Sequence, residues 1–202
     1  MKQLWLKRRN AYRTNRWSGG ETTEIFIYPE DGSYSERRFE FRLSSATVIE
    51  KESLFSDLSG FYRYLMPLNN TITLIHDEHI EKKLAVFQVA EFDGGLRTQS
   101  IGQCRDLNLM VNQQWGFSGQ FEQITRSMTL NCTDLFTGFL ALDDKIILES
   151  KKEEFLMTLN KGDFLMVQSE SDFDVSVKSV SSQFKMVRVA ITKKPEADGT
   201  TR

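Results

Sequence analysis

Phe39–Val48 reads FEFRLSSATV, and the alternation within this stretch decides the fold class. Phe39, Phe41 and Leu43 occupy every second position, and the residues between them are polar, Arg42 among them. Successive side chains of a β-strand point to opposite faces, so a period of two predicts a strand with one apolar and one polar face. We therefore expect this segment to be a strand that covers a core.

Other short segments have the same strand character and are separated by turn residues. Residues 23–28 (TEIFIY) are β-branched and aromatic, and residues 173–177 (FDVSV) alternate between apolar and polar side chains. Asn69-Asn70 and Asp143-Asp144-Lys145 each separate two such segments, and we expect a β-hairpin at both places. A helix is expected only at residues 50–58.

The 202 residues contain two similar runs of short, regularly spaced strands, which is typical of sandwiches and barrels. We expect an all-β, mainly antiparallel fold with a first barrel over residues 1–115. A second, degenerate barrel is expected over residues 116–192. Residues 193–202 (KKPEADGTTR) are expected to form a disordered tail, as polar chain ends often do.

The balance of charges argues against nucleic acid as a partner. The 26 basic and 28 acidic residues leave a formal net charge of −2, which cannot gather phosphates over a distance. A basic cluster near the N-terminus is interpreted as a solvated face rather than a nucleic-acid surface. It consists of Lys7, Arg8, Arg9, Arg13 and Arg16.

Neither a signal peptide nor a membrane segment is expected. The apolar run near the N-terminus is too short for a signal peptide, and no stretch approaches the roughly 20 apolar residues that span a bilayer. We therefore expect a cytoplasmic protein. Cys104 and Cys132 form no CxxC motif and are expected to be buried thiols, with a single disulfide as the alternative.

Six stretches of the first half resemble, in the same order, the signature of one protein family. They are residues 18–25 (SGGETTEI), 39–46 (FEFRLSSA), 55–63 (FSDLSGFYR), 65–74 (LMPLNNTITL), 92–94 (FDG) and 106–110 (DLNLM). The family that they resemble is HutD/Ves. The resemblance implies a bicupin fold, with two double-stranded β-helix barrels of the jelly-roll type. It also implies a regulatory role with small-ligand binding, linked to histidine utilisation or stress, and no established enzyme activity.

The small number of histidines argues against a metal. Cupin enzymes hold a metal with two or three histidines and a glutamate, whereas this chain has only His76 and His79. Both lie in the polar stretch IHDEH (residues 75–79), which we expect to be an exposed turn. A metal site needs three or four converging donors, so we predict no metal and no cofactor.

Three polar residues in otherwise apolar strands are the main candidates for ligand binding. Arg42 points either to solvent or into the barrel mouth, where its planar guanidinium could hold an anion. Arg63 forms either a surface salt bridge or a ligand contact. Asn108 alternates with apolar neighbours and needs a hydrogen-bond partner if it is buried. For Arg42 in particular, the family resemblance favours the ligand site.

Three further polar residues are expected near these candidates. Ser44 shares the face of Arg42 in the predicted strand and is included in the ligand site. Glu24 is included as well, and it is also a candidate acid–base group, although no partner carboxylate is evident. Asp106 is expected to pair with an arginine and hold it in position.

These residues support one leading hypothesis and two alternatives. The leading hypothesis is a metal-free binding protein for a small carboxylate or amide, with a small anionic molecule as partner and no catalytic residue. The first alternative is a cupin-type enzyme of unknown reaction, either metal-dependent or using Glu24 and Asp106 for acid–base chemistry. The second is a barrel filled by side chains and used only for protein interaction. Whether the chain forms a homodimer is left open.

Overall fold

The computed structural model describes residues 2–193, and these are almost entirely β-structure. The strands are β1 Gln3–Lys7, β2 Arg13–Trp17, β3 Gly20–Tyr28, β4 Phe41–Val48, β5 Glu52–Leu54, β6 Phe61–Pro67, β7 Ile72–His76, β8 Ile80–Leu84, β9 Ala90–Asp93, β10 Thr98–Ile101, β11 Cys104–Asn112, β12 Phe117–Ile124, β13 Met128–Cys132, β14 Phe136–Ala141, β15 Ile146–Ser150, β16 Phe155–Leu159, β17 Phe164–Gln168, β18 Phe173–Ser179 and β19 Met186–Lys193; two 3₁₀ helices are η1 Arg9–Ala11 and η2 Gln113–Trp115. The predicted all-β class is confirmed. No helix among the described residues is long and apolar enough to cross a membrane.

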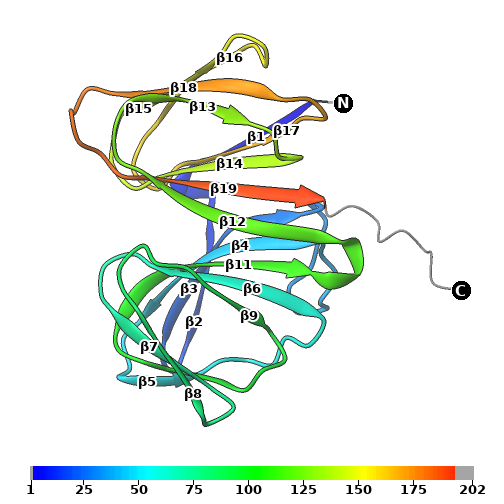
Figure 1. The fold of residues 1–202 in the computed structure, drawn as a ribbon, viewed down its shortest axis with the longest axis vertical. Coiled ribbons are helices and arrows are strands. Elements are labelled where there is room, and N and C mark those ends of the chain that lie inside the picture. The colour runs from blue at the N-terminus through cyan, green and yellow to red at the C-terminus, as the bar shows by residue number, and fades with distance from the viewer. Residues whose placement is uncertain (1, 194–202) are drawn as a thin grey trace, which may run out of the picture.

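The strands form four antiparallel sheets that make two barrels (Figure 1). The first barrel consists of the six-stranded sheet β2-β3-β4-β11-β6-β9 and the four-stranded sheet β5-β10-β7-β8. The second barrel consists of the five-stranded sheet β1-β17-β14-β19-β12 and the four-stranded sheet β13-β18-β15-β16. The two larger sheets lie in the middle of the molecule, and the two smaller sheets lie at its outer ends.

An aromatic core fills the space between the two larger sheets. Phe41 of β4 packs against Phe136 of β14, with ring centroids 4.9 Å apart, and Phe26 of β3 packs against Phe164 of β17 at 5.8 Å. Burial of large aromatic side chains stabilises such a contact strongly. The two barrels are therefore joined back to back through a shared apolar core.

The predicted apolar face of residues 39–48 is confirmed only in part. Phe41 and Leu43 lie in the shared core between the barrels. Phe39 precedes β4 and belongs to a separate cluster, in which its ring stacks on Phe61 at 4.6 Å. The period of two begins only where β4 begins, so the prediction that Phe39 shares this face was wrong.

Both predicted hairpins were wrong, because each turn connects the two sheets of a barrel instead of two paired strands. β6 pairs with β11 and β9, whereas β7 pairs with β10 and β8. The same separation holds for β14 and β15. Asn69 accepts a hydrogen bond from the backbone N–H of Arg105, and Asn70 donates one to the carbonyl of Gln103. The two asparagines therefore fix a corner between sheets.

The helix predicted at residues 50–58 was also wrong. Residues 52–54 form β5, which pairs with β10, and the residues that follow form a loop across the barrel. Hydrogen bonds to a strand distant in sequence thus override a weak local preference for helix. The loop carries Phe55 to the mouth of the first barrel, where it becomes part of the site described below.

The N-terminal strand joins the second barrel. β1 pairs with β17 along its whole length, with Trp5 opposite Met166, although the two strands are far apart in sequence. The predicted boundary between the two barrels at residue 115 stays a prediction. Strand β1, however, belongs to a sheet whose other strands all come from the C-terminal half of the chain. The predicted tail at 193–202 lies outside the described residues, except for Lys193, which ends β19.

The interiors of the two barrels differ in chemistry. The second barrel is filled by apolar side chains, including Leu165, Val175 and Val177, all with no exposed surface. The predicted apolar face of residues 173–177 is confirmed. In the first barrel, the six-stranded sheet directs polar side chains inward. Cys104 and Cys132 are free and buried, as expected.

Candidate functional site

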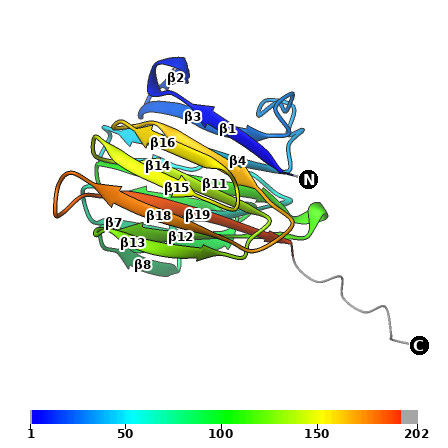
Figure 2. The ribbon, with the colours of Figure 1, turned by 90° about the horizontal axis from the view of Figure 1, so that it is seen from above.

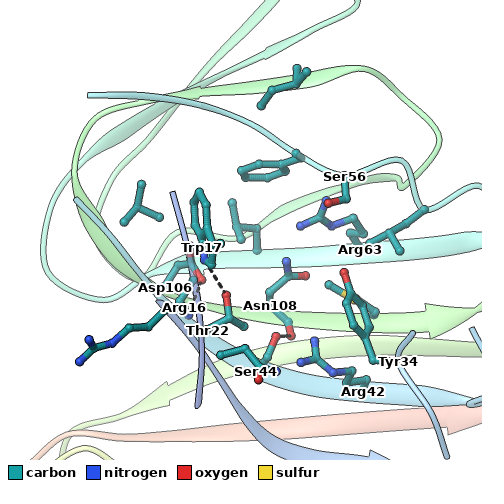
Figure 3. Close-up of a pocket in the computed structure, with 18 residues that line it drawn as sticks. Arg16, Trp17, Thr22, Tyr34, Arg42, Ser44, Ser56, Arg63, Asp106 and Asn108 are labelled. Atoms are coloured by element: carbon teal, nitrogen blue, oxygen red, sulfur yellow. Dashed lines mark hydrogen bonds between the residues drawn. The ribbon is translucent and has the colours of Figure 1, made fainter. Parts of the chain in front are cut away.

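A cavity of about 290 Å³ lies inside the first barrel against the inner face of the six-stranded sheet (Figure 3). Strands β4, β6 and β11 form its floor, and the loop after β5 contributes to its wall. Its lining residues are Asn15, Arg16, Trp17, Thr22, Tyr34, Arg42, Ser44, Ala46, Val48, Leu54, Phe55, Ser56, Leu58, Arg63, Leu65, Asp106, Asn108 and Met110. The side chains of four predicted ligand-binding residues, Arg42, Ser44, Arg63 and Asn108, come together here.

Strand register explains why residues from three separate segments meet. Met110 of β11 pairs with Arg42 of β4 on one side and with Arg63 of β6 on the other. Asn108 pairs with Ser44 in the same way. Neighbouring strands are about 4.8 Å apart, so the backbones that carry the two arginines are roughly 10 Å apart. The two cations thus flank Met110 of the central strand, and the polar side chains of Asn108 and Asp106 follow on the same face of that strand.

Arg63 is the most unusual residue of the cavity. Its side chain is buried, and it has no ion pair within the described part of the chain. The guanidinium carbon lies 4.5 Å from the ring centroid of Phe55 and 5.3 Å from that of Phe92, and Nε has no hydrogen-bond partner. Burial lowers the pKa of Arg63 to about 10, although the charge of Asp106 opposes this effect. Arg63 is therefore an incompletely compensated cation that is still protonated at neutral pH.

Arg42 is buried in the cavity wall and faces the barrel interior rather than solvent. Its Nε donates a hydrogen bond to Oε2 of Glu24 at 2.7 Å, and its guanidinium carbon lies 4.3 Å from the ring centroid of Tyr34. Glu24 does not line the cavity and is partly open to solvent. The structure thus places Glu24 as the partner that orients Arg42, and not among the residues that would touch a ligand in the cavity.

Asp106 and Asn108 supply the acceptors on the central strand. Asp106 is buried, which raises the pKa of its carboxyl to about 6 against the lowering effect of a hydrogen bond from the Ala46 backbone N–H. The charge of Arg63 lowers this pKa as well, but the two groups form no close ion pair. Oδ1 of Asn108 is buried and has no hydrogen-bond partner. The hydroxyl of Ser44 donates a hydrogen bond to the backbone carbonyl of Asn108, and not to this side-chain oxygen, at 3.5 Å.

Two aromatic residues that line the cavity and lie against its arginines Arg42 and Arg63 were missed by sequence reasoning. Tyr34 lies between Arg42 and Arg63 in Figure 3, and Phe55 packs over Arg63. Both come from loops, where no strand periodicity marks a side chain as pointing inward. The stretch FSDLSGFYR at residues 55–63 did contain a signal, because it resembles a family motif and includes Phe55 as well as Arg63.

Comparison with known proteins shows which family the chain belongs to. A model of the HutD family matches residues 9–184. The chain belongs to the HutD family. No curated protein matches it in sequence. Among solved structures, the conserved protein of unknown function PA5104 from Pseudomonas aeruginosa PAO1 is 20% identical with a TM-score of 0.81, covering 94% of this chain and 99% of that chain.

Two further solved structures extend the comparison of this HutD-family chain. HutD from Pseudomonas fluorescens SBW25, in a formate condition, is 20% identical with a TM-score of 0.75, and the match covers 96% of this chain and 100% of that chain. The bacterial pirin YhhW from Escherichia coli, in complex with nickel(II), is 7% identical with a TM-score of 0.64, covering 96% and 100% of the two chains. At these identities the likeness shows the fold alone. It confirms the cupin-like class.

The histidines of this HutD-family chain are not arranged as predicted. His76 is not on an exposed turn but buried at the end of β7, where Nδ1 lies 2.9 Å from the hydroxyl of Thr98 and the ring lies 4.8 Å from that of Phe92. His79 is exposed. The described residues contain no group of three His, Cys, Asp or Glu side chains that could hold a metal ion. The absence of a metal stays a prediction.

Proposed function

We propose that this HutD-family chain binds a small organic anion, carrying a carboxylate and an amide or similar donor, in the cavity of its first barrel. The observation that carries the proposal is Arg63, a buried guanidinium that faces the cavity without an ion-pair partner among the described residues. An unpaired buried charge costs several kcal/mol, and an anion placed beside it would offset that cost. The planar guanidinium is well suited to a carboxylate.

The rest of the cavity supports the same class of ligand. Arg42 provides a second cation on the far side of β11, and its own partner Glu24 lies outside the cavity lining. The unpartnered Oδ1 of Asn108 requires a donor, which an amide N–H or a bound water would supply. Leu54, Phe55 and Leu65 supply an apolar wall for the body of the ligand.

The proposed role is regulatory and metal-free, as for a protein that senses a metabolite and does not transform it. Membership of the HutD family supports a link to histidine utilisation or to stress. The related HutD from P. fluorescens was solved in a formate condition, and formate is the smallest carboxylate. We further propose that the protein acts in the cytoplasm, without nucleic acid or membrane as partner.

Calorimetric titration with a series of small carboxylates and carboxylate-amides tests the proposal. We expect saturable binding by at least one of them, weakened at least about tenfold by Arg63→Met and by Arg42→Ala, because each removes a charge-assisted contact. Arg126→Ala is the matched control, since Arg126 is exposed and lies outside the cavity. Binding that is unaffected by the two cavity variants would refute the proposal, and absence of any binding would favour an interaction protein.

One observation favours an acid–base enzyme as the second candidate. A pKa of about 6 would let the Asp106 carboxyl exchange a proton near neutral pH, and the carboxyl lines the cavity. The predicted second acid–base group, Glu24, does not line the cavity. Chemical change of the bound carboxylate, detected by mass spectrometry and abolished by Asp106→Asn, would establish this candidate in place of the binding protein.

A further inference from the structure

We propose a second anion site, for phosphate or a phosphoryl group, on the opposite side of the six-stranded sheet, at the seam between the two barrels. A separate cavity of about 290 Å³ lies there. It is lined by Arg9, Tyr12, Thr14, Glu21, Thr23, Ile25, Ser45, Thr47, Arg105, Leu140 and Gly162. None of these residues lines the cavity of the first barrel.

Strand alternation separates the two cavities. Asp106 and Ser44 point into the first barrel, so their neighbours Arg105 and Ser45 point to the other face of the same strands. On that face, the apolar core between the barrels ends at Ile25 and Leu140, and polar side chains replace it. Figure 2 shows β1, β2 and β3 gathered at this side of the molecule, where the chain crosses from one barrel to the other.

Arg105 is held in position at the base of the cavity. Its Nε donates to the hydroxyl of Ser45 at 3.2 Å, and that hydroxyl donates to the Asp106 carbonyl at 2.7 Å. Burial and the nearby charge of Arg9 both lower the pKa of Arg105. Within the described residues Arg105 has no ion pair, and its two terminal amino groups make no hydrogen bond to protein. This guanidinium is oriented for a bidentate contact that the protein itself does not supply.

Arg9 supplies the second cation from the opposite wall. Its aliphatic stem packs over Gly162 in the second barrel, since a Cβ built at Gly162 would lie 2.8 Å from Cδ of Arg9. The nearest carboxylate on that wall, Asp163, is already bound by Arg8 at 2.6 Å and by the backbone N–H of Arg9. Asp163 is therefore engaged elsewhere, and the side chain of Arg9 has no ion pair in the described chain.

The remaining lining explains why a phosphate-type oxyanion fits. Tyr12 donates its hydroxyl hydrogen to the Gly162 carbonyl at 2.8 Å, and Thr14 and Thr23 share a hydrogen bond of 2.8 Å at the cavity. A hydroxyl carries one hydrogen, so Tyr12 has none left for a ligand, whereas the Thr14–Thr23 pair keeps one that can be donated. This hydroxyl and the two guanidinium groups are the donors that phosphate oxygens need. Glu21 is the opposing charge of the lining, so its carboxylate should weaken binding of the anion. Removing an arginine of the lining should therefore lower the affinity for phosphate, whereas removing the charge of Glu21 should raise it.

The test is calorimetric titration of the full chain with inorganic phosphate in a phosphate-free buffer at low salt. We expect Arg105→Gln and Arg9→Gln each to weaken binding on the order of tenfold or more, and Glu21→Gln to tighten it. Arg13→Gln is the matched control. Arg13 is exposed on β2 and does not line the cavity, so this substitution removes the same charge outside the site. We expect this control to bind phosphate as the unmodified chain does.

Arg63→Met separates this site from the first cavity. Phosphate binding that persists in Arg63→Met but weakens in Arg9→Gln supports the seam site. Binding lost in Arg63→Met and retained in the two seam variants would place phosphate in the first barrel and overturn the proposal. Absence of phosphate binding by the unmodified chain would overturn it as well. Because Arg9 is exposed, Arg9→Gln remains informative even if Arg105→Gln does not fold.

Discussion

Replacement of Asp106 by asparagine should stabilise the protein at neutral pH. Asp106 is buried in the first barrel, and burial raises the pKa of its carboxyl from 3.8 to about 6. The ionised form is thus less favourable in the folded protein than in the unfolded chain. Asparagine has a similar shape, carries no charge, and keeps an oxygen that can accept the hydrogen bond from the Ala46 backbone N–H.

The magnitude and the pH window follow from the raised pKa. The folded protein holds the Asp106 proton more tightly than the unfolded chain, so this group lowers the free energy of unfolding as pH rises from about 4 to about 6. Above about pH 6 the Asp106 carboxyl is ionised in both states, and the free energy of unfolding has fallen by the full amount due to this group. A difference of about 2 pKa units at about 1.4 kcal/mol each corresponds to about 3 kcal/mol. Asp106→Asn should recover up to about that amount at pH 8 and almost nothing near pH 4.

Urea denaturation of both proteins between pH 4 and pH 8 measures this difference. Other carboxyl groups titrate in the same range, but their contributions cancel when the variant is compared with the unmodified protein at each pH. If the two free energies of unfolding differ by the same amount at pH 4 and pH 8, or if Asp106→Asn is the less stable protein at pH 8, the argument is refuted.

Asp163→Asn is the control of opposite sign. Burial raises the pKa of Asp163, but hydrogen bonds from the Arg9 backbone N–H and the Arg8 side chain outweigh burial and leave the pKa lowered. A carboxylate with a lowered folded pKa stabilises the protein above the unfolded pKa, and this contribution is lost as pH falls. Asp163→Asn should therefore destabilise the protein at neutral pH, and the effect should shrink at acid pH.

Three further outcomes are expected from single properties of the structure. Arg63→Met should raise the free energy of unfolding by about 1–3 kcal/mol in the absence of ligand, because it removes a buried, unpaired charge; a loss of stability in urea denaturation would show that the cation is compensated. Leu165→Ala should cost about 2–5 kcal/mol, because Leu165 has no exposed surface in the filled second barrel; a cost below 1 kcal/mol would contradict that packing. Cys104 and Cys132 should resist a thiol reagent at pH 8 until the protein is unfolded, since burial raises their pKa values to about 12 and about 11; rapid reaction of either thiol in the native protein would contradict their burial.

The sequence alone was enough to predict that segments such as β4 and β18 are strands, and on which sides their residues lie. A strand places alternate residues on opposite faces whatever surrounds it, so Arg42 and Ser44 had to share one face and Phe41 and Leu43 the other. The same local rule set Asn108 opposite its apolar neighbours. Four of the five predicted ligand residues line one cavity, and Glu24 is the exception.

Only the tertiary structure decided which face is enclosed and which distant segments meet. The pairing of β1 with β17 and the corner at Asn69-Asn70 depend on hydrogen bonds between residues far apart in sequence, which local patterns do not encode. His76 looked like part of an exposed turn because its neighbours are polar, yet strand pairing buries it against Phe92. Arg9 and Arg105 line one cavity because the two barrels pack back to back, and no spacing within either segment indicates that contact.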